Sequence, residues 1–225
     1  MGNTKTYRVL FVYYSYSQQT LQVVEAMGEA FRARGWDVAR AAIEFTDARY
    51  AERFSRFPLR RPYLDLLGML PAQLRRATGS IRVPAEAQSG GYDLVCIGSP
   101  TWWLTTNMPV RSWLSSEDAS RVLQGTKFAA IAVCRRYWRN NLETVKRLAT
   151  ERGSTYLDGI HFTWLGGQIG SLLSLLSYLG SGEARPRYLG VPIPPPNIPA
   201  DQLAAARAFA GSLADRIGAA GARST

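Results

Sequence analysis

The chain has 225 residues and a mass of 24.9 kDa, with 46% hydrophobic and 20% charged residues. This composition excludes a wholly disordered chain, and the length suits one large domain or one domain with an added segment. The two cysteines, Cys96 and Cys134, are too few for a disulfide framework or a zinc cluster. We therefore expect no bound metal and a location in a reducing cytoplasm.

The charge is the unusual property, because 24 arginines and 3 lysines against 17 acidic residues give a net charge of +10. Residues 49–82 hold eight arginines and two acidic residues, and residues 135–139 hold three more arginines. A solvated surface, an anionic ligand, an acidic partner protein or peripheral contact with a membrane would each account for this excess. Nucleic acid ranks last, since no binding motif accompanies the charge. The uncharged segment 159–182 is too rich in glycine and serine for a transmembrane span.

Apolar runs rich in β-branched and aromatic residues alternate with amphipathic runs along the chain. We expect strands at 8–14, 36–43, 92–98, 128–134 and 155–164. We expect helices at 20–34, 107–114, 140–152, 169–179 and 200–217. Such alternation predicts an α/β fold, with five parallel strands covered by helices on both faces.

Two segments depart from this alternation. Prolines divide residues 45–91 into short pieces, which predicts an Arg/Pro-rich insertion with one or two short helices. Residues 180–199 are rich in glycine and proline and are expected to form a long loop. We therefore expect a single domain over residues 1–225. Ligands of parallel sheets bind at the carboxyl ends of the strands, so the loops that follow the strands are the places to look for a site.

The loop after the first strand carries three hydroxyl groups in six residues and leads directly into a helix. Its sequence is Ser15-Tyr16-Ser17-Gln18-Gln19-Thr20. Unpaired N–H groups and the positive end of the helix dipole attract anions, so this loop is a candidate phosphate site. Ordinary capping of the helix by serine and threonine is the alternative.

The loop after the third strand carries adjacent tryptophans, in the sequence Ser99-Pro100-Thr101-Trp102-Trp103. Two neighbouring side chains in one turn do not both point into the core, and an aromatic pair suits stacking on a flat heterocycle. The alternative is that one tryptophan packs under the insertion at 45–91, as buried tryptophans commonly do.

With these two loops in order, the chain resembles the flavodoxin family, including its NAD(P)H-quinone reductases. The resemblance covers residues 8 to about 165 and extends to a branch labelled after dialkylresorcinol biosynthesis. It implies a flavodoxin-like sheet of order 2-1-3-4-5 and the cofactor FMN. The phosphate contacts it implies are Ser15, Ser17, Gln18, Gln19 and Thr20. The ring contacts it implies are Ser99, Pro100, Thr101, Trp102 and Trp103.

Two features depart from the family pattern. Gln18 stands where the family often has glycine, which would weaken phosphate binding if that position needs a positive φ. The loop after the fourth strand holds arginines and aromatics where relatives usually have glycines or acidic residues. We expect Arg136 to contact the flavin or an anionic substrate, and Arg135 and Tyr137 to orient the substrate or stabilise negative charge. An ordinary charged surface is an equal alternative.

The other reactive residues are more simply structural. A nucleophilic Cys134 would need a base, and the one histidine, His161, lies on the fifth strand. A small buried thiol is the better interpretation of Cys134, since free cysteines are usually buried and inert.

The sequence favours an FMN-dependent oxidoreductase that passes hydride from NAD(P)H to a quinone or similar aromatic acceptor. One alternative is a one-electron carrier of the flavodoxin type, although a rim of arginines would stabilise reduced, anionic flavin rather than lower its potential. The other is a flavodoxin-fold accessory protein that has lost FMN. A homodimer is compatible with all three.

Overall fold

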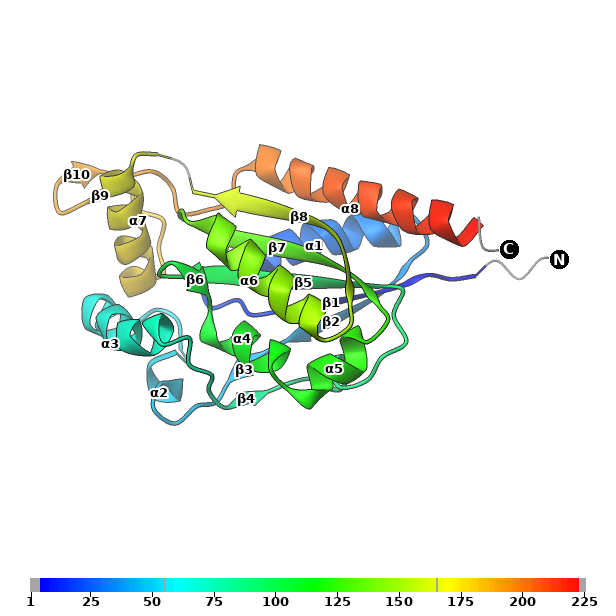
Figure 1. The fold of residues 1–225 in the computed structure, drawn as a ribbon. Helices are drawn as coiled ribbons and strands as arrows, with labels where there is room; N and C mark the ends of the chain where they lie inside the picture. Colours follow the sequence, from blue (N-terminus) through cyan, green and yellow to red (C-terminus); the bar gives the residue numbers. More distant parts are fainter. Residues whose placement is uncertain (1–4, 55, 165, 223–225) are drawn as a thin grey trace.

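The structure is a computed structural model that describes residues 5–54, 56–164 and 166–222 (Figure 1). Five parallel strands form its centre: β1 (Arg8–Tyr13), β2 (Asp37–Ala42), β5 (Leu94–Trp102), β7 (Lys127–Cys134) and β8 (Thr155–Thr163). Their order is β2-β1-β5-β7-β8, which confirms the expected flavodoxin-like order 2-1-3-4-5. The point where the strand order reverses lies between β1 and β5, so their loops are the expected ligand site.

Both faces of the central strands are buried, which explains their nearly continuous apolar sequences. In β1, Leu10 and Val12 face one side while Val9 and Phe11 face the other, and all four are fully buried. The helices on the first side are α4 (Met108–Leu114), α5 (Glu117–Leu123) and α6 (Trp138–Glu151). The helices on the second side are α1 (Gln19–Arg32) and α8 (Ala200–Ala222) (Figure 1).

The third strand runs further than its sequence predicts. Residues 99–102 continue β5, because Ser99 and Pro100 still pair with β7 and the chain then turns back into β6 (Thr105–Thr106). The predicted loop is therefore the end of a strand and a tight turn at Trp103 and Leu104. Backbone pairing on both sides holds this segment more firmly than a free loop would be held.

The two ends of the segment between β2 and β5 lie side by side. Its ends pair as two short antiparallel strands, β3 (Glu44–Phe45) and β4 (Ile81–Arg82), and a 3₁₀ helix at Ala85–Ala87 follows. Between these strands lie α2 (Ala51–Phe54) and α3 (Pro62–Leu74), where one or two short helices were expected.

A further helix, α7 (Gln168–Ser181), contacts α3 at the same end of the sheet (Figure 1). We call α2, α3 and α7 the roof. The region expected as a long loop contains a small hairpin, β9 (Arg187–Tyr188) and β10 (Val191–Pro192). Within the described ranges, every helix is too short or too polar to cross a membrane.

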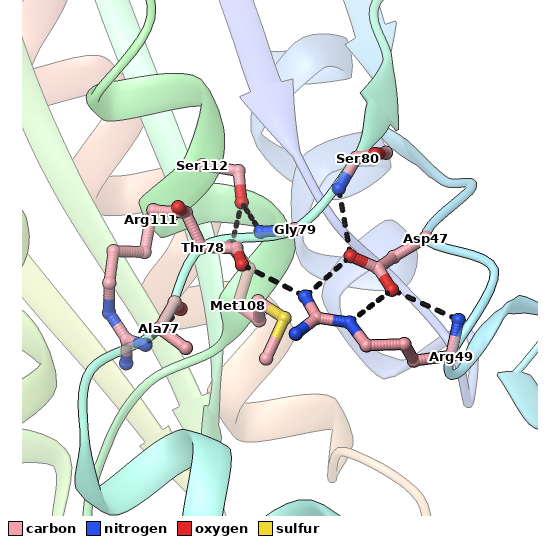
Figure 2. A network of polar contacts seen from close by, with 9 residues as sticks. All are labelled: Asp47, Arg49, Ala77, Thr78, Gly79, Ser80, Met108, Arg111 and Ser112. Carbon is pink, nitrogen blue, oxygen red and sulfur yellow. Dashed lines mark hydrogen bonds and ion pairs between the residues drawn. The ribbon is translucent and has the colours of Figure 1, made fainter.

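A buried carboxylate joins the two ends of the segment that carries α2 and α3. Figure 2 shows Asp47 accepting hydrogen bonds from the Arg49 Nε at 2.9 Å and from the Ser80 N–H at 3.2 Å. The Arg49 guanidinium also donates to the carbonyl of Thr78 at 3.4 Å. The hydrogen bond between Asp47 and Ser80 joins residues that are 33 positions apart in sequence. These contacts therefore hold together the two ends of the segment that carries α2 and α3.

We call the contacts among Asp47, Arg49 and Ser80 the Asp47 clasp. Helix α4 is hydrogen-bonded to the chain beside this clasp. The Gly79 N–H donates to the Ser112 hydroxyl of α4 at 2.9 Å (Figure 2), and buried Arg111 donates to the carbonyl of Ala77 at 2.9 Å. A Cβ at Gly79 would lie 2.7 Å from an Asp47 carboxylate oxygen, so glycine is needed for this close approach.

We expect Asp47→Asn to lower the free energy of unfolding by about 1–2 kcal/mol at neutral pH. The hydrogen bonds from Arg49 lower the pKa of Asp47 to about 2, below the usual value near 3.9. The stabilisation is therefore complete above about pH 4 and is lost as the pH falls toward 2. The expected loss of stability is smaller than the full pKa shift would give, because the Arg49 side chain is 60% exposed and water screens its charge.

Urea unfolding at a series of pH values measures this effect. The parent and the variant should differ most at neutral pH and converge as the pH falls below 4. Asp37→Asn is the matched control, because Asp37 also pairs with an arginine, Arg8, but its side chain is 58% exposed. The control should cost less than about 1 kcal/mol. A constant difference across the pH range would contradict the role of the Asp47 charge.

Candidate functional site

A cavity of about 370 Å³ lies at the carboxyl ends of the strands, beneath the roof. The loops after β1, β5 and β7 form its floor. Its described lining from these loops and from the end of β8 is Tyr16, Ser17, Gln19, Thr20, Pro100, Thr101, Trp102, Trp103, Leu104, Val133, Cys134, Arg135, Arg136, Tyr137 and Trp164. From the roof it is lined by Phe54, Leu66, Met69, Leu172, Leu175 and Leu179, and Leu59, between α2 and α3, adds to this lining. The cavity is thus largely apolar and aromatic, and its charged lining residues among those described are arginines.

The loop after β1 presents backbone donors to this cavity. The backbone N–H groups of residues 16–20 donate no hydrogen bond to any described residue. The Ser15 hydroxyl is used locally, since it accepts from the Leu21 N–H at 3.1 Å. Gln18 precedes the helix with φ 62°, the left-handed conformation in which glycine is favoured. This loop therefore offers the free N–H groups and the positive helix end that bind an anion.

Gln19 and Thr20 add side-chain polar groups at the same place. Both are almost fully buried, and both line the cavity. The amide nitrogen and oxygen of Gln19 are buried without a hydrogen-bond partner in the described structure. Buried amides are normally satisfied, so this one points to a polar ligand in the cavity.

The adjacent tryptophans have different surroundings. Trp102 packs among roof and sheet aromatics, with ring centroids 5.2 Å from Phe54 and 5.5 Å from Tyr14. Trp103 is more exposed and donates its indole N–H to the carbonyl of Leu66 in α3 at 3.2 Å. The alternative that one tryptophan packs under the segment 45–91 therefore describes Trp102, although both residues line the cavity.

A buried asparagine of α6 fixes the strand end that carries the tryptophans. Asn141 is fully buried, and its side-chain nitrogen donates to the carbonyl of Ser99 and to the hydroxyl of Thr101, both at 2.9 Å. Its side-chain oxygen accepts from the hydroxyls of Ser99 and Thr106, both at 2.8 Å. Because all four of its hydrogen-bonding positions are used, Asn141 holds β5, β6 and α6 in one arrangement.

The loop after β7 brings two arginines to the cavity. Arg135 donates to the carbonyl of Gln168 at 2.8 Å and to the Ser171 hydroxyl at 3.1 Å, at the beginning of α7. Among the described residues, Arg136 has one hydrogen-bond partner, because its guanidinium donates to the side-chain oxygen of Gln168 at 3.3 Å. Both line the cavity, so they place positive charge where no described carboxylate lines it. An anionic group is the ligand that this arrangement favours.

Three residues with positive φ stand in the three floor loops. They are Gln18 (62°), Trp103 (56°) and Tyr137 (61°). A left-handed conformation costs a residue other than glycine roughly 1–2 kcal/mol. Such outliers gather at functional sites, and here one lies in each loop that borders the cavity.

Acid–base and nucleophilic candidates are weak at this site. Burial raises the pKa of the Cys134 thiol to about 11, so the thiol stays protonated at neutral pH. His161 stacks on Trp138 with ring centroids 3.7 Å apart, away from the lining residues. The described residues contain no group of His, Cys, Asp and Glu side chains suited to hold a metal ion.

Ten of the thirteen residues expected at the site line this one cavity: Ser17, Gln19, Thr20, Pro100, Thr101, Trp102, Trp103, Arg135, Arg136 and Tyr137. The other three, Ser15, Gln18 and Ser99, support the loop backbones instead. None of these thirteen residues belongs to the roof. The apolar spacing of 62–74 predicts a helix but does not say which part of the sheet the helix covers.

Comparisons with known proteins agree with the fold. No model of a known protein family matches the chain, and no curated protein matches its sequence. Among solved structures, a flavodoxin from the domain Archaea is similar over 94% of this chain and 99% of its own length, with TM-score 0.51 and 13% identity. A flavoprotein from Lactobacillus acidophilus, in its apo form, covers 70% of this chain and 93% of its own, with TM-score 0.49 and 14% identity. At such identities, the likeness to the archaeal protein shows a flavodoxin-like α/β fold.

The residues at the cavity fit a phosphate ester joined to a flat aromatic ring, as in FMN. The free N–H groups of residues 16–20 and the unpaired amide of Gln19 suit the phosphate end. The aromatic side chains of Trp102, Trp103 and Tyr137 suit a ring.

Proposed function

We propose that this protein is an FMN-dependent oxidoreductase that uses NAD(P)H to reduce a quinone or similar aromatic acceptor. The net reaction consumes NAD(P)H, a proton and the quinone, and it yields NAD(P)⁺ and the hydroquinone. The observation that carries the proposal is the row of unpaired N–H groups at residues 16–20, which opens into an aromatic cavity. The resemblance to flavodoxin-like quinone reductases, including the branch labelled after dialkylresorcinol biosynthesis, supports the same reaction class.

In this proposal the side chains bind and orient, and FMN supplies the hydride- and electron-transfer chemistry. The N–H groups of the loop after β1 and the Thr20 hydroxyl hold the phosphate. Trp103 and Tyr137 flank the space for flat ligands, and the roof excludes water from it. Arg135 is already bonded to α7 and so presents a fixed positive charge to the acceptor or to charge that develops on it.

Arg136 is the residue best placed to recognise an anionic nicotinamide. It lines the cavity and has one protein contact, so its guanidinium can turn to the 2′-phosphate of NADPH. We expect the apparent KM for NADPH to rise with salt while kcat changes little, because salt screens charges beyond roughly 8 Å. The KM for NADH should respond less.

Steady-state reduction of a neutral quinone across a salt series measures this dependence. Arg136→Glu should raise the KM for NADPH and flatten its salt dependence. Arg139→Glu is the matched control, because Arg139 lies close by in the first turn of α6 but stacks on Trp138, outside the cavity lining. Equal effects of the two variants would contradict the assignment of Arg136.

The visible absorption spectrum of the purified protein tests the cofactor itself. A yellow protein that releases FMN on denaturation supports the proposal, provided that it oxidises NAD(P)H with a quinone present. A yellow protein without such turnover would favour the electron carrier. A protein that neither contains nor takes up FMN would favour the accessory role.

A further inference from the structure

The exposed large apolar side chains of the described residues gather on one part of the molecule. Among the described residues, the exposed large apolar side chains are Tyr63, Leu64, Leu67, Leu74, Trp103, Leu104, Tyr137, Ile169, Leu172, Leu189 and Val191. All of them belong to α3, α7, the β9–β10 hairpin and the turns after β5 and β7. Figure 1 shows these segments together, at the end of the sheet where the cavity lies. Scattered exposed apolar residues are ordinary, but a gathered set marks an interaction surface.

Helix α3 carries apolar side chains on two opposite sides. Leu64, Leu67 and Leu74 are 61%, 56% and 64% exposed, and their spacing of three and seven residues puts them on one side of the helix. Met69 and Gln73, on the opposite side, are buried against the rest of the protein. The helix therefore turns one apolar side inward and another outward, and the outer one has no covering in the described chain.

Arginines bracket this helix at both ends. Arg60 and Arg61 precede it, Arg75 and Arg76 follow it, and all four are exposed. None of the four has a carboxylate within ion-pair distance among the described residues. The one acidic residue of the helix, Asp65, is largely buried and lies near Arg53 instead. We call Arg60, Arg61 and Arg75, with the exposed apolar residues named above, the mouth face; Arg76 instead borders α6.

We propose that the mouth face docks on an anionic lipid bilayer, with α3 lying in the plane of the interface. Apolar side chains with arginines beside them suit such a surface, because the leucines enter the acyl boundary while the guanidiniums bind lipid phosphates. A second copy of this chain fits less well. A symmetric dimer through this face would bring the same unpaired arginines together.

The proposal also gives the acceptor a route, and this part rests on the proposed function. Trp103, Leu104, Tyr137 and Leu172 belong both to the mouth face and to the cavity lining, so they form its rim. A docked protein would open its cavity toward the bilayer. The acceptor class that this arrangement suits is a lipid-soluble quinone, which would enter without crossing water.

Co-sedimentation of the purified protein with vesicles tests the docking without any turnover. We expect binding to phosphatidylcholine vesicles that contain about one third phosphatidylglycerol, weak binding to pure phosphatidylcholine, and loss of binding at high salt. Arg60→Glu with Arg61→Glu should weaken binding roughly 30-fold or more, since each arginine near an anionic surface contributes about fivefold. Leu64→Ser with Leu67→Ser should also weaken it, although the net charge is unchanged.

The matched control is Arg32→Glu with Arg34→Glu, which changes the net charge equally at the other end of α1. Equal losses in the two arginine variants would show that net charge alone attracts the protein, and this would overturn the proposal. So would equal binding to neutral and anionic vesicles. A concentration-dependent dimer in sedimentation velocity, lost in the leucine variant, would instead assign the face to a second copy. A flavin-free protein that still binds vesicles would reject the proposed function and leave the docking standing.

Discussion

FMN is expected to bind Thr20→Val roughly 10- to 150-fold more weakly than the parent protein. The substitution keeps the shape of the side chain and removes the hydroxyl of Thr20, a cavity-lining residue in the first turn of α1. A hydrogen bond to a charged acceptor contributes about 1.5–3 kcal/mol, which corresponds to that range of affinity. Isothermal titration of the flavin-free protein with FMN gives the dissociation constant directly.

Two controls separate the phosphate contact from general damage to the site. Thr20→Ser keeps the hydroxyl and loses only a methyl group, so its affinity for FMN should stay within a few-fold of the parent. Riboflavin lacks the phosphate, so it should bind Thr20→Val as it binds the parent. If riboflavin and FMN lose affinity equally, the phosphate does not lie at residues 16–20.

The parts of the site that could be predicted from sequence are those set by local rules. Parallel strands end at a common edge, so the loops that follow them meet there whatever the rest of the chain does. The order of apolar and polar runs therefore suffices to place Thr20, Trp102 and Arg136 near one another. The positive φ of Gln18 also follows from a local rule, because the loop turns directly into a helix at this residue.

The roof could not be predicted in this way. Whether α3 covers the cavity depends on the Asp47 clasp, on β3–β4 pairing, and on the hydrogen bond from the Leu59 N–H to the carbonyl of Leu179 at 2.7 Å. These contacts join residues far apart in sequence, and no periodicity encodes them. The apolar outer side of α3 shows the same limit, since a sequence pattern reveals that a helix is apolar but not which side remains uncovered.

The sequence also does not predict which polar residues of the helices are buried. Arg111 and Asn141 lie in helices whose sequences give no sign of their burial, because arginine and asparagine are usually exposed. Burial lowers the pKa of the Arg111 guanidinium to about 10, so it remains charged at neutral pH. Carbonyl oxygens satisfy it, including that of Ala77. Such residues are identified by their partners, and their partners become known only with the fold.

Asn141→Ala is expected to lower the free energy of unfolding by roughly 2–4 kcal/mol, because it leaves buried groups without partners and opens a small cavity. Urea unfolding measures the loss. Asn140→Ala is the matched control, since Asn140 is exposed and makes one bond to the carbonyl of Leu104, so we expect a loss below about 1 kcal/mol. Asn141→Asp keeps the volume but cannot donate to the Ser99 carbonyl, so it should also be destabilising. If Asn141→Asp is as stable as the parent, the hydrogen bonds of Asn141 do not hold the end of β5, and the position of Trp103 must depend on its contact with α3 instead.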